Sequence, residues 1–385
     1  MFIDILCLAL TFVFFWSTII VFLGLVKPSR TYRRAKDKLH FTVVVCARNE
    51  ENVIAFPVKT CLEADYPKDK LRVVVCADNC TDATAQVAEL AGAEVWVKTV
   101  PSAGKGDVLK WAMERLKGQG AEAVAVFDAD NRVDKHWFAA MNDALQGGEQ
   151  VVTGCRHASN SLAGMISGWY AAYWDVMNEL SNRVRTNLGL SGKLTGTGFA
   201  FKYALIEARG WDTRTLVEDV EFSVQCNLEG VRVSYVADAD YADEQPETWR
   251  AMWRQLRRWA TGGWQVARGY FWPWVAALCK KPSLRLFDSY FAILTGMSVA
   301  FVHFSNILAL ALNRNWHFFF SVFGSIVFMS WFMCFSAVAL SKKGGGKPGW
   351  LAIFTFPLFS LILSASVLVT LVYPTRTWKP ITHGN

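Results

Sequence analysis

Long apolar stretches at both ends of the chain constrain its fold more than any other feature of the sequence. Residues 2–26 contain one charged residue, Asp4, and are long enough to cross a bilayer core of about 30 Å as a helix. Three further apolar stretches lie at residues 287–312, 318–340 and 351–373. Since 52% of the residues are hydrophobic, the chain is too apolar for an ordinary soluble protein, and we expect part of it to lie in lipid.

Basic residues beside these stretches predict which side of the membrane the polar middle of the chain faces. Lysines and arginines crowd residues 27–38, directly after the first stretch, which lacks the features of a cleaved signal peptide. The positive-inside rule therefore places the following domain in the cytosol. The loop at residues 341–349 carries Lys342, Lys343 and Lys347, which is again a cytosolic signature. If all four apolar stretches cross the membrane, both termini lie outside. If one of the last three is re-entrant or interfacial, the tail at residues 375–385 is cytosolic instead.

Charge and the spacing of cysteines and histidines argue against two other classes of protein, those that bind nucleic acid and those with a zinc site recognisable from sequence spacing. The net charge of +7 comes from basic residues beside apolar stretches and near a predicted phosphate site, and no nucleic-acid recognition motif accompanies it. The nine cysteines are scattered without C-x-x-C spacing, and the six histidines form no ligand pattern. We therefore expect no nucleic-acid partner, and we interpret most of the cysteines as reduced, buried apolar residues and the histidines as structural.

The first part of the polar middle alternates short β-branched runs with longer helical ones. The predicted strands are residues 41–46, 71–76, 94–97 and 123–127, and the predicted helices between them are residues 51–63, 81–91 and 106–117. Repeated βαβ units of this kind build a parallel sheet. Ligands of such sheets bind beyond the carboxyl ends of the strands, so the residues just after each strand are the candidates for a site.

Three polar turns follow predicted strands, at residues 47–51, 77–82 and 128–131. For any one turn, helix capping by Asp or Asn would be the favoured interpretation. Three such turns at one edge of a sheet instead favour a site for a nucleotide and a hard divalent cation. Asp128 and Asp130, one residue apart after a buried strand, can share a Mg²⁺ or Mn²⁺ ion that also binds phosphate oxygens, although a lone D-x-D is common by chance.

A lysine between two glycines precedes the third predicted helix. Lys105, flanked by Gly104 and Gly106, could place its ammonium group and the amino terminus of that helix near a phosphate. The spacing is not that of a Walker A loop, and a plain flexible turn is an equal alternative.

Three motifs further along the chain carry a resemblance to a known family. They are T-G-T-G-F at residues 195–199, V-E-D-V-E at residues 217–221 and Q-L-R-R-W at residues 255–259. This ordered set resembles the membrane-bound, mostly processive family 2 glycosyltransferases, such as cellulose, hyaluronan, chitin-oligosaccharide and poly-N-acetylglucosamine synthases. The resemblance covers about residues 41–264, and the Q-x-x-R-W motif is its most specific part.

The resemblance implies an α/β GT-A (Rossmann-like) cytosolic domain joined to an α-helical transmembrane domain. It implies that Asp78 contacts the nucleoside base, while Asp128 and Asp130 meet the diphosphate, the latter through the metal. Asp219 would be the general base that takes the proton of the acceptor hydroxyl in an inverting displacement. Glu218 beside it would raise that basicity or cap the following helix.

The resemblance also implies contacts at the diphosphate and at the acceptor. Gln255 and Arg258 would face the diphosphate, and the flat indole of Trp259 would form a platform for the acceptor sugar. The turn of Gly196, Thr197 and Gly198 would lie near the acceptor end, where glycines let the backbone approach. Val217 stands where many relatives carry Thr, and the turn before Phe199 lacks the cysteine of cellulose synthases; both weaken an assignment to cellulose.

Two amphipathic aromatic segments flank these motifs. Residues 162–180 have helical spacing of apolar and aromatic side chains, for which a place in the core is favoured over membrane contact. In residues 249–260, basic and aromatic side chains coincide, which favours an interfacial helix that holds the Q-x-x-R-W motif at the membrane.

The expected organisation has five parts. They are a transmembrane helix at residues 1–27, a cytosolic GT-A domain at 40–248, the Q-x-x-R-W segment with interfacial helices at 249–283, three transmembrane helices at 284–374, and a tail at 375–385. The protein would be integral to the plasma (inner) membrane. A homo-oligomer or an accessory secretion subunit would be needed if four spans form too small a channel.

The leading interpretation is a synthase that extends a β-linked polysaccharide or oligosaccharide from a UDP-hexose or UDP-N-acetylhexosamine. The alternative within enzymes is a single transfer of one sugar to a membrane lipid. A membrane protein that binds or exports glycans without catalysis is disfavoured, because the whole set of motif residues is present.

Overall fold

The computed structural model describes residues 2–207, 209–314, 316–341 and 346–375. Lys342, Lys343 and all of the predicted tail except Thr375 therefore lie outside the described residues. The chain divides into two compact units, which we describe separately. The sheet unit comprises Arg30–His157 and Gly192–Glu244, and the helical unit comprises residues 2–29, 158–191 and 245–375.

A mixed sheet of eight strands forms the centre of the sheet unit, in the order β3-β2-β1-β4-β7-β6-β8-β5. Its strands are β1 (Phe41–Ala47), β2 (Leu71–Asp78), β3 (Glu94–Lys98), β4 (Ala123–Asp128), β5 (Arg132–Val133), β6 (Val151–Ala158), β7 (Phe199–Lys202) and β8 (Val233–Asp243). The pairs β1 with β2, β1 with β4 and β2 with β3 are parallel. The pairs β4 with β7, β6 with β7 and β5 with β8 are antiparallel.

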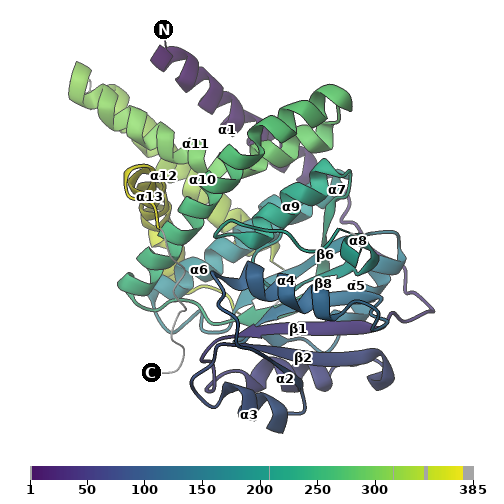
Figure 1. Ribbon diagram of the computed structural model, residues 1–385. Coiled ribbons are helices and arrows are strands. Elements are labelled where there is room, and N and C mark those ends of the chain that lie inside the picture. The colour runs from purple at the N-terminus through teal and green to yellow at the C-terminus, as the bar shows by residue number, and fades with distance from the viewer. Residues whose placement is uncertain (1, 208, 315, 342–345, 376–385) are drawn as a thin grey trace. The chain divides into compact units, whose positions relative to one another are not determined.

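Helices cover both faces of this sheet. They are α2 (Ala55–Leu62), α3 (Thr84–Leu90), α4 (Lys105–Arg115), α5 (Trp137–Gln146), α8 (Ala204–Glu207) and α9 (Glu218–Leu228), with a 3-10 turn, η1, at Lys68–Lys70. Val43 and Val45 of β1 pack in one cluster with residues of α2, α3 and α5. Val44 points to the other face and packs with residues of α4 and α9. In Figure 1, α2 and α3 lie below β1 and β2, and α4 lies above them.

The four predicted strands are confirmed as β1 to β4, each within two residues of its predicted ends. The predicted helices between them are also present, but the first two begin three to four residues later because polar turns precede them. The prediction of a parallel sheet holds only for these four strands. The other half of the sheet, from β5 to β8, was not predicted, and it joins β4 through the antiparallel strand β7.

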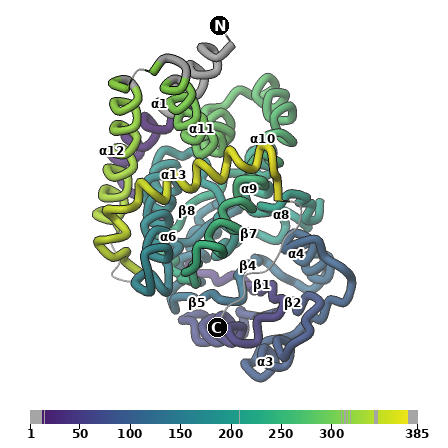
Figure 2. Tube along the Cα trace, turned by 90° about the vertical axis from the view of Figure 1, so that its left-hand side faces the viewer, coloured from purple at the N-terminus to yellow at the C-terminus, as the bar shows by residue number. Residues whose placement is uncertain are grey.

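The helical unit contains long apolar helices. Its elements are α1 (Phe2–Val26), α6 (Met165–Asp175), the π-helix η2 (Val176–Arg183), α7 (Val184–Asn187), α10 (Trp249–Lys280), α11 (Leu284–Asn313), α12 (Trp316–Leu340) and α13 (Trp350–Val372). Figure 2 shows α13, in yellow, running past α6 and α12, against which it packs. The segments Leu284–Leu308, Phe319–Leu340 and Trp350–Val372 are long and apolar enough to cross a membrane. A crossing by α1 stays a prediction, since its apolar part found among the described residues, Phe15–Val26, is shorter.

The aromatic segment after β6 lies in the core of the helical unit, as predicted. Trp169 and Tyr170 of α6 are almost fully buried, and they pack in one cluster with residues of α10 and α13. The helix predicted over residues 162–180 begins at Met165 and continues as η2, where the hydrogen-bond pattern changes to that of a π-helix. The placement of residues 249–260 along lipid headgroups stays a prediction.

Candidate functional site

The turn after β4 and the Gly-Thr-Gly turn before β7 are joined by hydrogen bonds. The amide of Asp128, the last residue of β4, donates to Thr197 Oγ1 at 2.9 Å and to Asn131 Oδ1 at 3.1 Å. Thr197 also donates its hydroxyl to Asn131. Because these bonds fix the backbone at Asp128, the carboxylates of the D-x-D turn lie beside residues 196–198.

Lys105, the first residue of α4, connects the same two turns. Its Nζ lies 2.5 Å from Asp128 Oδ1 and donates to the carbonyl oxygen of Gly196 at 2.7 Å. Burial alone would lower the pKa of Lys105, but the negative charges of Asp128 and Glu218 outweigh it and raise the pKa above its ordinary value. The lysine is therefore held charged at the amino terminus of a helix, where the positive end of the helix dipole also attracts anions.

Asp130 is buried beside other acids. Its side chain accepts hydrogen bonds from the amide of Glu244 at 3.2 Å and from Asn131 Nδ2 at 3.3 Å. Burial raises the pKa of Asp130 well above its ordinary value, and the charges of Asp243 and Asp128 raise it further, while Arg156 opposes them. An oxygen-coordinated cation would relieve this crowding of negative charge.

Arg156 balances part of that charge from β6. Its Nε donates to Asp243 Oδ1 at 3.0 Å, its Nη2 bonds the second oxygen of the same carboxylate, and its Nη1 bonds the carbonyl oxygen of Thr195. A two-point arginine and carboxylate pair of this kind fixes both side chains in direction as well as in charge. The pair thus attaches the end of β8 to the turn that carries Gly196.

The start of α9 lies next to the start of α4. A Cβ atom added at Gly106 would come within 2.7 Å of Thr213 Oγ1 and 3.4 Å of the Cβ of Glu218. Glycine at this position therefore leaves room for Thr213, in the segment that leads into α9. Glu218 and Asp219, the first two residues of α9, are both buried, and the charge of Glu218 acts on Lys105.

Asp78 forms a second polar centre at the end of the neighbouring strand β2. It is buried, it pairs with the guanidinium of Arg48 from the end of β1, and it accepts a hydrogen bond from Ser102 Oγ at 2.7 Å. Lys98 Nζ lies 3.9 Å from the same carboxylate. Since β2, β1 and β4 are parallel neighbours, the expectation that the three polar turns share one sheet edge is confirmed.

The remaining motif residues belong to α10 of the helical unit. Trp259 stacks on Tyr173 with ring centroids 5.9 Å apart and an interplanar angle of 24°. It also meets Tyr170 and Trp174 edge to face, at 5.9 and 5.8 Å. Trp259 is thus part of an aromatic cluster, and the roles predicted for it, for Gln255 and for Arg258 stay predictions.

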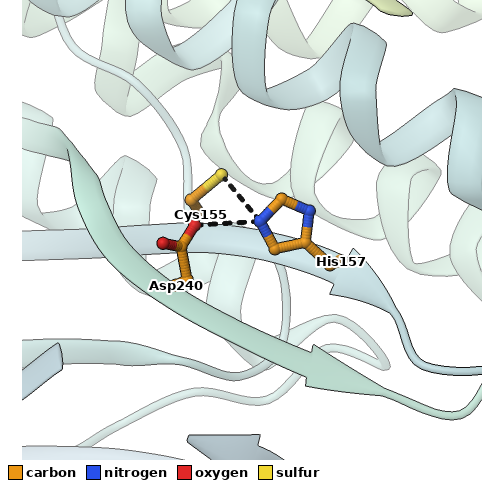
Figure 3. Close-up of side chains that lie close together, drawn as sticks. All are labelled: Cys155, His157 and Asp240. Atoms are coloured by element: carbon orange, nitrogen blue, oxygen red, sulfur yellow. Dashed lines mark hydrogen bonds and ion pairs between the residues drawn. The ribbon is translucent and has the colours of Figure 1, made fainter. Parts of the chain in front are cut away.

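One compact cluster of polar side chains was not predicted from the sequence. Cys155 Sγ lies 3.4 Å from His157 Nε2, and the same nitrogen lies 2.9 Å from Asp240 Oδ1, as Figure 3 shows. Burial lowers the pKa of His157, but the hydrogen bonds to Asp240 and Cys155 outweigh it and raise the pKa to about 10. The C-x-H spacing on a strand was the available signal, because alternate residues of a strand share one face.

The sequence matches a model of the family described as "Glycosyltransferase like family 2" over residues 38–262, more than half of the chain. Among curated relatives, the probable glycosyltransferase YdaM of Bacillus subtilis is 28% identical over 60% of this chain and 57% of its own length. The beta-monoglucosyldiacylglycerol synthase of Nostoc sp. is 29% identical over 64% of this chain and 53% of its own length. The probable glucomannan 4-beta-mannosyltransferase 7 of Oryza sativa is 28% identical over 57% and 40%. The chain thus spans about half the length of the curated relatives it matches.

A solved structure shares the fold. The mannosyltransferase PcManGT from Pyrobaculum calidifontis, determined in complex with GDP-Man and Mn²⁺, superposes with a TM-score of 0.60 over 95% of this chain and 98% of its own, at 17% identity. At that identity the likeness shows the fold alone. The expected GT-A fold, accompanied by helices that can cross a membrane, is confirmed.

Proposed function

Because the chain belongs to the family 2 glycosyltransferases, we propose that it moves a sugar from a nucleoside diphosphate to an acceptor at a membrane, with inversion at the anomeric carbon. One observation supports this most: Lys105 holds together Asp128 of the D-x-D turn and Gly196 of the Gly-Thr-Gly turn. The starts of α4 and α9 lie beside this contact. An ammonium group, a carboxylate and a glycine turn thus lie together. Transfer of a sugar from a diphosphate to a hydroxyl would use such groups to position the reactants and to stabilise charge.

The donor would bind along the edge of β2, β1 and β4. Asp78, held in one direction by Arg48 and Ser102, would accept hydrogen bonds from the nucleoside base. Lys105 and the amino terminus of α4 would face the diphosphate, since both attract anions. The donor we expect is a UDP-hexose or a UDP-N-acetylhexosamine.

Asp130 and Asp128 fit a divalent cation. Asp130 is buried close to two other carboxylates, and its pKa is raised by that burial and by their charges, so a hard cation is the natural partner of the ionised group. When bound, Mg²⁺ or Mn²⁺ would neutralise charge that develops on the departing diphosphate. PcManGT was determined with Mn²⁺, which agrees with this assignment. Arg156 keeps Asp243 in place beside the pair.

Asp219 would act as the general base. A carboxylate must take the proton of the acceptor hydroxyl as the new bond to the sugar forms. Asp219 lies in the first turn of α9, next to Glu218, whose charge acts on Lys105. A base in that place would lie close to the proposed donor site.

Gln255, Arg258 and Trp259 would complete the site at the diphosphate and the acceptor. Trp259 is partly exposed within an aromatic cluster that includes Tyr173, and a flat indole suits the apolar face of a pyranose. The residues 196–198 would lie at the acceptor end of the donor site. The catalytic unit would be cytosolic and the protein would be integral to the plasma (inner) membrane, with a homo-oligomer or accessory subunit if the product needs a channel.

Two acceptors remain in competition. Extension of a β-linked glycan agrees with the motif set and with relatives named as glucomannan mannosyltransferases. Transfer of one sugar to a membrane lipid is favoured by relatives named as beta-monoglucosyldiacylglycerol synthases, which match more of this chain. Membrane helices would bring either acceptor to the site.

A donor screen tests the proposal. Purified protein in lipid would be given UDP- and GDP-sugars together with a membrane extract as acceptor, and release of the nucleoside diphosphate would be measured. We expect release with at least one donor, loss of release with a chelator, and recovery with Mg²⁺ or Mn²⁺. Asp130→Asn should abolish it, whereas Asp238→Asn, an exposed carboxylate on β8, should not. No release with any donor, or full activity in Asp130→Asn, would contradict the proposal.

Product sizing separates the two acceptors. Labelled donor would be incubated with the membrane-embedded protein, the products would be partitioned between organic solvent and water, and both phases would be sized by chromatography. A long water-soluble product supports glycan extension. One lipid-soluble product that carries a single sugar ends that interpretation and supports the lipid acceptor.

A further inference from the structure

Cys155, His157 and Asp240 form a compact cluster on two neighbouring strands of the sheet unit. Cys155 and His157 lie on β6, and Asp240 lies on β8, which is adjacent to β6 in the sheet. Figure 3 shows the thiol and the carboxylate on the same side of the imidazole, both directed at one ring nitrogen. One ligand-type atom of each residue lies within 4.8 Å of the others.

This cluster faces away from the acidic site around Asp130. Side chains of a strand alternate between its two faces, so Cys155 and His157 share one face while Arg156 points to the other. On that other face, Arg156 pairs with Asp243 close to Asp130. Asp240 and Asp243 are three residues apart on β8 and therefore also face opposite ways. The cluster is thus separate from the Asp128 and Asp130 pair.

The distances suit a small tetrahedral ion. Zinc binds thiolate sulfur at about 2.3 Å and imidazole nitrogen at about 2.0–2.1 Å, which places two such ligands of a tetrahedron about 3.5 Å apart. Cys155 Sγ and His157 Nε2 are 3.4 Å apart. His157 Nε2 and Asp240 Oδ1, now 2.9 Å apart, would separate by about 0.4 Å to accept the ion between them.

We propose that Cys155, His157 and Asp240 bind a zinc ion. Thiolate and imidazole are soft or intermediate ligands that select zinc over Mg²⁺ and Mn²⁺, whereas the all-carboxylate pair Asp128 and Asp130 selects the harder ions. Three protein ligands leave the fourth position to water or another small ligand. The ion would fasten β6 to β8 and so hold Arg156 and Asp243, on the opposite face, in register beside Asp130. Its role would be to position these residues.

Metal content and cobalt spectroscopy test the zinc site without reference to transfer activity. The full-length protein would be purified without chelator and its metals measured by mass spectrometry, and Co²⁺ would then be exchanged into the site. We expect about one zinc per chain, and an absorption band in the near ultraviolet from a cobalt–thiolate bond. Cys155→Ser and His157→Gln should each weaken metal binding by at least about tenfold, and Cys155→Ser should remove the band.

Two control variants make the result specific. Cys279→Ser changes an exposed cysteine of α10 and should keep the zinc and the cobalt band. Asp130→Asn should also keep them while it loses Mn²⁺ binding, which separates this proposal from the proposed transferase function. Should Cys155→Ser fail to fold, His157→Gln and the cobalt spectrum of the unaltered protein decide the matter. Zinc binding that survives both substitutions, or no cobalt–thiolate band in the unaltered protein, would overturn the proposal.

Discussion

Two glycines of the Gly-Thr-Gly turn are constrained for different reasons. Gly196 and Gly198 both have positive φ, +93° and +64°, which non-glycine residues adopt at a cost of about 1–2 kcal/mol. A Cβ atom at Gly198 would also lie 2.1 Å from ring carbons of Tyr241, whose hydroxyl donates to the carbonyl oxygen of Thr197. A Cβ atom at Gly196 would meet nothing closer than Arg156 Nη1, at 3.9 Å.

Gly198→Ala should therefore destabilise the protein much more than Gly196→Ala. We expect about 1 kcal/mol for Gly196→Ala, and a further 1–3 kcal/mol or so for Gly198→Ala, because the buried Tyr241 ring has to move. Thermal unfolding of the two variants, side by side in the same detergent, measures the difference. Equal losses of stability in the two variants would show that the Tyr241 ring moves at no cost in free energy.

Lys105 should contribute to donor binding through its charge. Lys105→Met keeps the length of the side chain but removes the cation that contacts Asp128 and faces the proposed diphosphate. Hydrogen bonds to charged groups contribute about 1.5–3 kcal/mol, so we expect kcat/KM for the donor to fall roughly 10- to 100-fold. Lys110→Met, an exposed lysine on the same helix, is the matched control. An unchanged donor kcat/KM in Lys105→Met would remove the lysine from the site.

At the scale of residues, local sequence patterns predicted the polar turns. They did not predict which distant residues support those turns. Asp128, Asp130 and Lys105 could be found from their neighbours along the sequence. Arg156 and Asp243 are 87 residues apart in the chain, and neither belongs to a motif. Their pairing follows from the order of the strands, which no local pattern encodes.

At the scale of elements, the two halves of the sheet differ in how they can be read from sequence. β1, β2 and β4 are buried on both faces and appear as continuous apolar runs, which are typical of parallel strands. β6 and β8 carry charged or polar residues such as Arg156, His157 and Asp240. Their charges are paired inside the fold, so these strands lack the continuous apolar run that marks β1, β2 and β4 in the sequence.

Glu149 lies just before β6 and connects two other parts of the sheet unit. These are the first residue of the unit, Arg30, and the segment around the start of β8. Glu149 is buried and pairs with Arg232 at 2.6 Å and Arg30 at 2.7 Å, and it accepts a hydrogen bond from Ser234 at 2.7 Å. Burial raises the pKa of Glu149, but these partners outweigh it and leave the pKa below its ordinary value. Stability from this group is therefore full above the unfolded pKa of 4.5 and is lost as the pH falls below it.

Glu149→Gln should destabilise the sheet unit and flatten this acid dependence. We expect a loss on the order of 2 kcal/mol at pH 7, less than for a fully buried pair because both arginines are partly exposed. Denaturant unfolding at pH 7 and pH 4 measures both effects, with Glu89→Gln, an exposed residue of α3, as the control. A variant whose stability falls with acid as steeply as that of the unaltered protein would contradict this account.

At the scale of the whole molecule, the long apolar helices were the most predictable part. The three predicted stretches near the end of the sequence correspond to α11, α12 and α13, because length and hydropathy alone define a span. The polar contacts that join α11 to α7 and α1 were not predictable. Asp288 of α11 is fully buried, pairs with Arg185 of α7 at 2.9 Å, and accepts a hydrogen bond from Trp16 of α1 at 3.1 Å.

Asp288→Ala should strongly destabilise the helical unit, since it leaves the buried guanidinium of Arg185 without its carboxylate. Breaking a buried pair on one side removes about 3–5 kcal/mol of stability. The double variant Arg185→Met and Asp288→Leu removes both charges, and it should be more stable than Asp288→Ala alone. The temperature at which each protein aggregates in detergent ranks the stability of the unaltered protein, Asp288→Ala and the double variant. A double variant less stable than Asp288→Ala would contradict the prediction.

The central claim, that this chain transfers a sugar with Asp219 as base, is tested most directly by the transfer rate and donor affinity of Asp219→Asn. The asparagine keeps the shape of the side chain at the start of α9 but cannot take a proton. We expect donor affinity close to that of the unaltered protein and a transfer rate lower by roughly 10² or more, while Asp212→Asn, exposed in the same unit, stays near normal. Near-normal transfer by Asp219→Asn would contradict the account.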